Sequence, residues 1–165
     1  MGTTIAEIRD FLNHQRIALI GLSRNPKDFS RMLFREMCNR GYDMVPVNPA
    51  ASELEGRTCV RRVQDIDPPV EGALIMTSSG ETTRVVQDCV EAGIRRVWMY
   101  RGGGQGAVSK EAADLCHEND IALVEGYCPF MFLPHTRLLH RVHGFMLKLV
   151  GSYPGKAQAH AHSGM

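Results

Sequence analysis

The sequence lacks the closely spaced cysteines that form a disulfide framework or a metal site. Its five cysteines, an odd number, are far apart, and no two form a C-x-x-C pair: Cys38, Cys59, Cys89, Cys116 and Cys128. This pattern indicates reduced thiols and predicts a cytoplasmic protein.

Long apolar runs and an excess of either charge are also missing. No segment approaches the ~18 uninterrupted apolar residues of a membrane helix, and residues 1–14 lack the apolar core of a signal peptide. The net charge is only +1, so no overall field attracts nucleic acid or an anionic membrane. We therefore expect a soluble protein with no transmembrane segment and no nucleic-acid partner.

What the sequence does contain is an alternation of strand and helix patterns. Short runs that are apolar on both faces are typical of buried parallel strands, and they occur at residues 17–20, 44–47, 72–76, 97–100 and 121–124. Apolar residues at helical spacing precede or separate these runs, over residues 4–14, 30–40, 78–93 and 109–117. Ser78 and Glu81 match a capping box. The alternation predicts an α/β fold, a Rossmann-like doubly wound and mainly parallel sheet.

The fold pattern occupies residues 1–130, and two further segments follow it. Residues 131–152 carry an apolar stripe with basic and histidine residues between, which predicts an appended amphipathic helix. We expect it to pack on the sheet edge or to form a homodimer contact; a membrane surface or another protein are the alternatives. Residues 153–165 are predicted to be a disordered tail. His140 and His143 share a helix face, but they lack the other parts of a zinc motif, so no metal site is predicted.

The turn after the first strand is the most informative motif. Gly21, Leu22 and Ser23 close that strand just before a helix, whose first N–H groups and dipole favour an anion such as a pyrophosphate. Nearby basic and polar side chains could add contacts. The alternative is a plain tight turn with solvated side chains, since the full dinucleotide fingerprint is absent.

The end of the second strand separates two kinds of ligand. NAD-binding Rossmann domains usually place Asp or Glu here to hold the ribose. This chain has Val47, Asn48 and Pro49, and the nearest acids are Glu53 and Glu55. Asn48 can still bond a base or ribose, but the NAD signature is missing.

Several of these motifs together resemble a known family. Gly21 and Ser23 after the first strand, Ser30 at the helix start and Val47-Asn48-Pro49 are similar to the opening of the bacterial CoA-binding domain family. Its members are small stand-alone relatives of the CoA-binding domain of succinyl-CoA synthetase. Further features shared with this family occur later in the sequence: Glu55-Gly56-Arg57, Asp65-Ile66, Val97-Trp98, the glycine loop at 102–106 and Cys128. The resemblance covers about residues 15–130.

The resemblance implies coenzyme A as the cofactor. It implies that the CoA diphosphate lies over residues 21–23, that Asn48 and Pro49 border the adenosine, and that Thr77 and Ser78 line the crevice. The full set of predicted ligand-binding residues is Gly21, Leu22, Ser23, Arg24, Asn25, Lys27, Ser30, Arg31, Val47, Asn48, Pro49, Thr77 and Ser78. The chain departs from the family after residue 76, where an aromatic or Arg-Pro segment is usual, and in its longer glycine loop.

The sequence is compatible with three functions. The first, which we predict, is a binding module that holds CoA or an acyl-CoA non-covalently and has no catalytic residue. The second is a component of an acyl-CoA ligase or transferase acting with a partner chain, with Cys128 as a reactive thiol; the alternative for Cys128 is a half-buried structural cysteine. The third is an NAD(P)-binding redox or sensor domain.

Overall fold

A five-stranded parallel sheet forms the centre of the computed structural model, which describes residues 2–102 and 104–134. The strand order is β2-β1-β5-β6-β7. The strands are β1 (Arg16–Ile20), β2 (Asp43–Val47), β5 (Gly72–Ile75), β6 (Arg96–Met99) and β7 (Ala122–Glu125). Each lies within one residue of its predicted range, and the Rossmann-like α/β architecture is confirmed.

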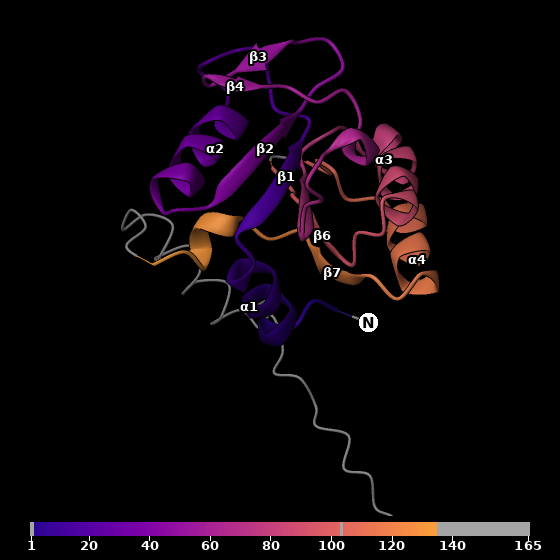
Figure 1. Cartoon of the computed structure of the whole chain (residues 1–165). Coiled ribbons are helices and arrows are strands. Elements are labelled where there is room, and N and C mark those ends of the chain that lie inside the picture. The colour runs from indigo at the N-terminus through magenta and orange to yellow at the C-terminus, as the bar shows by residue number, and fades with distance from the viewer. Residues whose placement is uncertain (1, 103, 135–165) are drawn as a thin grey trace, which may run out of the picture.

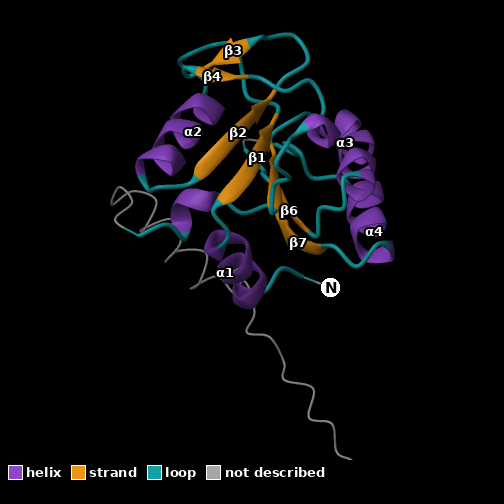
Figure 2. Cartoon of the chain, viewed as in Figure 1, coloured by secondary structure: helices purple, strands orange, loops and turns teal. Residues whose placement is uncertain are grey.

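Helices cover both faces of the sheet (Figures 1 and 2). The helices α1 (Ile5–Asn13) and α2 (Phe29–Asn39) pack on one face, and α3 (Ser79–Glu91) and α4 (Lys110–Glu118) pack on the other. Short 3-10 turns occur at η1 (Val63–Asp65) and η2 (Pro129–Met131). Most of the predicted appended helix, and all of the predicted tail, lie outside the described residues. Within the described part of the chain, no helix has the length and apolar character needed to cross a membrane.

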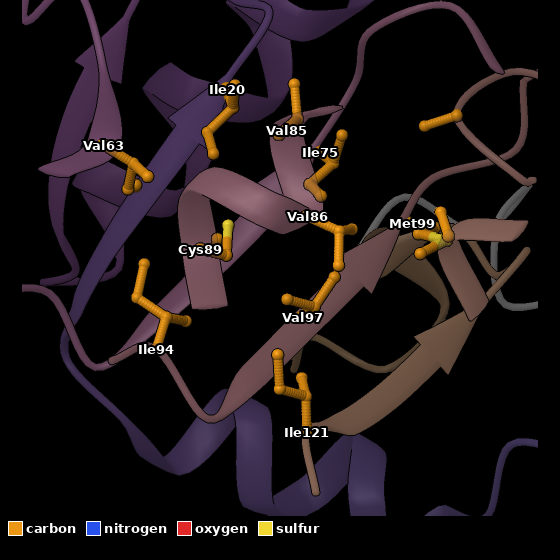
Figure 3. Packing of buried hydrophobic residues seen from close by; sticks show 14 of the residues in the cluster. Ile20, Val63, Ile75, Val85, Val86, Cys89, Ile94, Val97, Met99 and Ile121 are labelled. Atoms are coloured by element: carbon orange, nitrogen blue, oxygen red, sulfur yellow. The ribbon is translucent and has the colours of Figure 1, made fainter. Parts of the chain in front are cut away.

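Alternate residues of each strand point into two hydrophobic layers. Toward α1 and α2, the fully buried Trp98 packs edge-on against Phe11, with 5.3 Å between ring centroids. Toward α3 and α4, strand side chains such as Ile75 and Val97 pack against Val86 and Cys89 of α3 (Figure 3). Burial on both faces explains why the strands are continuously apolar in the sequence.

The connection from β2 to β5 is mostly irregular. It contains a small hairpin of β3 (Glu53–Leu54) and β4 (Arg57–Thr58). Both central turn residues, Glu55 and Gly56, have positive φ, as the tight turns of hairpins require. Val60 then forms an isolated parallel bridge with Val47. This bridge adds to the outer side of β2, the edge strand that carries Pro46.

The helix starts are only partly as predicted. Ser109 caps α4, and its Oγ accepts a hydrogen bond from Ala112 N. Ser78 is the N-cap of α3, but the predicted capping box is wrong, because no backbone N–H donates to the Ser78 side chain. The Glu81 N–H instead donates to the Ser78 carbonyl at 3.0 Å, so it is not available to the hydroxyl.

Candidate functional site

A cavity of about 680 Å³ lies at the carboxyl ends of β1 and β5. The chain leaves β1 for β2 through α2 on one face, and it leaves β5 for β6 through α3 on the other face. The β1–β5 junction is therefore the switch point of the sheet, where doubly wound folds bind ligands. The volume is within the usual range for small-molecule sites.

The sheet side of the cavity is built from residues that the sequence singled out. The lining includes seven of the predicted ligand-binding residues, which lie at or just after the ends of three neighbouring strands: Gly21, Leu22, Ser23, Val47, Asn48, Pro49 and Thr77. The remaining six, Arg24, Asn25, Lys27, Ser30, Arg31 and Ser78, are not part of this lining.

Gly21 allows two turns of the cavity floor to touch. Its φ is +90°, and a Cβ there would lie 2.9 Å from Thr77 N and 3.0 Å from the Met76 carbonyl carbon. Real Cβ atoms do not tolerate such distances to backbone, so only glycine fits. The close approach that requires this glycine is thus made by the chain itself, at the turn after β5.

The turn between β1 and α2 is held by its own side chains. Ser23 N donates to Ser30 Oγ at 3.0 Å. Asp28 is the N-cap of α2, and its carboxylate accepts hydrogen bonds from the amide and the hydroxyl of Ser30, at 2.8 and 2.6 Å. The Asp28 carboxylate already accepts a hydrogen bond at this helix terminus. The terminus therefore attracts an anionic ligand less strongly than the sequence predicted.

Arg31 supports the same turn from inside the protein. It is only 9% exposed; its Nε donates to Glu55 Oε1 at 2.6 Å, and its Nη1 donates to the carbonyls of Ser23 and Arg24. Its guanidinium is therefore used within the fold. Lys27 and the Arg24 side chain are exposed.

Asn48 joins two of the turns that line the cavity. Its Nδ2 donates to the Leu22 carbonyl at 2.8 Å, and its Oδ1 accepts from Ala50 N at 2.7 Å. An aspartate at this position could not donate to Leu22. The amide thus shapes the place where NAD-binding domains carry their acidic residue.

The opposite wall was missed by the sequence analysis. It is formed by η1, the residues before it and one side of α3, and its charged members are Arg61, Arg62, Asp65, Glu81, Arg84 and Asp88. The α3 members recur at helical spacing along one side of that helix, which was a usable signal. The position of Arg61 and Arg62 depends on the irregular connection 48–71, for which periodicity gives no prediction.

Cys128 lies outside the cavity lining. It is half-buried beside η2, and burial raises the pKa of its thiol, an effect that the N–H groups of Phe130 and Met131 partly offset. A raised pKa keeps the thiol protonated near neutral pH and lowers its nucleophilicity. The environment of this cysteine therefore does not activate it.

Comparison with known proteins identifies the family. Residues 15–134 match the CoA binding domain family. The chain belongs to this family. The match includes all five strands of the sheet and every residue that lines the cavity.

Relatives of this CoA-binding domain include both small and large proteins. The chain is 30% identical over 124 residues to the uncharacterized protein YneT of Bacillus subtilis, covering 74% of this chain and 89% of YneT. A hypothetical protein from Pyrococcus horikoshii has a similar structure, with a TM-score of 0.72, 28% identity and coverage of 78% and 88%. The alpha subunit of an ADP-forming acetate–CoA ligase of Pyrococcus furiosus is 24% identical over 78% of this chain, which spans 30% of that subunit.

Proposed function

We propose that this domain binds coenzyme A or an acyl-CoA non-covalently in the cavity between β1 and β5. The observation that supports the proposal is the location of the cavity. It lies at the switch point of the sheet, in a chain that belongs to the CoA binding domain family. In this binding mode the diphosphate lies over residues 21–23 and the adenosine lies beside Asn48 and Pro49. Thr77 borders the ligand at the end of β5.

The side chain at the end of β2 favours CoA over NAD. Both polar ends of the Asn48 amide bond to the surrounding turns, and no carboxylate takes the place from which NAD-binding domains hold the ribose. Glu55, one of the nearest acids in sequence, accepts hydrogen bonds from Arg31 and Arg35 instead.

The domain holds its ligand without reacting with it. The Cys128 thiol is outside the lining, and its pKa is raised by burial. The second candidate function is a component of an acyl-CoA ligase whose catalytic residues come from another chain. The similarity to part of an acetate–CoA ligase subunit supports it.

Calorimetric titration with CoA, acetyl-CoA and NADH tests the proposal. We expect both CoA species to bind in the micromolar range and NADH not to bind. Preferential binding of NADH, or no binding of either CoA species, would overturn it.

Intact-mass analysis after incubation with acetyl-CoA tests the absence of chemistry. The wild type and a Cys128→Ser variant are compared, and we expect no acetyl adduct on either protein. An adduct on the wild type that the variant lacks would make Cys128 an acyl acceptor.

A further inference from the structure

Three arginines line the cavity wall that lies opposite the turn of residues 21–23. The binding mode proposed above assigns no group of CoA to them. Arg61 and Arg62 precede η1, and Arg84 lies in α3. They are the arginines of the lining, whereas the basic residues near the turn after β1 lie outside it. The positive charge of the cavity is thus on the wall formed by η1 and α3.

Asp88 links several side chains of this wall, but it does not neutralise the charge of all three guanidiniums. Its Oδ1 accepts from Arg62 Nη2 at 3.0 Å and from Gln64 Nε2 at 2.8 Å. Arg62 also lies 3.8 Å from Glu91, so its charge is satisfied by two carboxylates. Arg84 Nη1 is 3.8 Å from Asp88 Oδ2, at the limit of an ion pair, and its side chain is 67% exposed.

Arg61 carries the least compensated charge on the wall. Among residues 2–102 and 104–134, no carboxylate lies within 4.0 Å of its guanidinium. Its position follows from the pairing of the preceding residue: Val60 bridges to Val47, and Asn48 N donates to the Val60 carbonyl at 3.0 Å. The backbone of Arg61 therefore lies directly beside Asn48 and Pro49.

We propose that Arg61 and Arg84 bind the 3′-phosphate of CoA and make the cavity selective for that phosphomonoester. The inference rests on the proposed function, which puts the adenosine beside Asn48 and therefore its ribose near Arg61. A phosphomonoester carries about −1.5 to −2 charges and three acceptor oxygens, which suits two guanidiniums that come from separate elements.

The carboxylates of the same cavity add to this selectivity. Asp28, Asp65 and Glu81 also line it, so anions are not attracted by the cavity as a whole. A ligand gains affinity only where its phosphate reaches the guanidiniums. NAD and 3′-dephospho-CoA carry no phosphate at that position and lack this contact.

Titration with CoA and with 3′-dephospho-CoA tests the inference, on the wild type and on Arg61→Ala and Arg84→Ala. Arg9→Ala is the matched control, because Arg9 is an exposed arginine of α1 on the other face of the sheet. We expect the wild type to bind CoA at least about tenfold more tightly than dephospho-CoA, and each of the two variants to lose about tenfold in affinity for CoA only. The control is expected to match the wild type with both ligands.

The outcomes separate this inference from the proposed function. Equal wild-type affinity for the two ligands would overturn the 3′-phosphate site and leave CoA binding intact. Equal loss of both ligands in the Arg61 and Arg84 variants would also overturn it, since their role would not concern that phosphate. Failure of the wild type to bind either ligand would instead overturn the proposed function.

Discussion

Gly21 and Gly41 share a left-handed backbone but have different surroundings. Their φ values are +90° and +91°, and a Cβ on Gly41 would meet nothing within 4 Å, whereas one on Gly21 would collide with the Thr77 backbone. We expect Gly41→Ala to lower the free energy of unfolding by about 1–2 kcal/mol through backbone strain alone. Gly21→Ala should lose a further ~1–3 kcal/mol from the collision. Urea denaturation measures both, and equal losses would mean that the two turns can move apart freely.

Glu71 makes the stability of the fold depend on pH. It lies at the amino end of β5, at the opposite end of the strand from the cavity. Hydrogen bonds from the Arg16 N–H, from His14 and from the Gln15 N–H lower the pKa of Glu71 from 4.5 to about 2. A lowered pKa means that the stabilisation is complete above pH 4.5 and is lost as the pH falls toward 2.

Denaturation of the wild type and of Glu71→Gln, each at pH 6 and pH 3, measures this contribution. The wild type should be the more stable at pH 6, and the difference between the two proteins should shrink at pH 3. A difference that does not change with pH would show that the Glu71 carboxylate does not supply it.

At the scale of elements, one carboxylate links the β3–β4 hairpin to α2. Glu55 Oε1 accepts hydrogen bonds from Arg31 Nε at 2.6 Å and from Arg35 Nη1 at 2.7 Å. The two arginines differ in burial, because the Arg31 side chain is 11% exposed and the Arg35 side chain is 46% exposed. Arg31→Ala should lower the free energy of unfolding by about 3 kcal/mol, because the buried pair and two carbonyl contacts are lost. Arg35→Ala should lose less than about 1 kcal/mol. Thermal denaturation compares the two, and similar losses would contradict the assigned difference in burial.

The sequence predicts the long elements better than the short ones for a physical reason. The runs at residues 17–20 and 97–100 are apolar on both faces because helices cover both sides of the sheet. The strands β3 and β4 have two residues each, too few for any period, and their turn of Glu55 and Gly56 is not a common hairpin signature. The capping box at Ser78 failed because a backbone carbonyl competed for the same N–H.

At the scale of the whole molecule, only one side of the cavity could be predicted from the sequence. The residues after β1, β2 and β5 meet because parallel strands end at one edge, so their positions follow from the strand pattern. Arg61 reaches the cavity through the pairing of Val60 with the edge strand, and no local pattern indicates that pairing. Arg31 is the opposite case. A basic residue near a phosphate-binding turn predicts a ligand contact, but the Arg31 guanidinium donates its hydrogen bonds within the fold.

If CoA occupies the cavity at the carboxyl ends of β1 and β5, its binding changes the surroundings of the residues at those strand ends. Amide chemical shifts of the ¹⁵N-labelled protein, followed during titration with CoA, test it most directly. We expect the largest changes at residues 20–23, 47–48 and 76–77, with little change around Glu71 and Arg96 at the amino edge of the sheet. Binding with the largest changes at that amino edge, and none at the three strand ends, would contradict it.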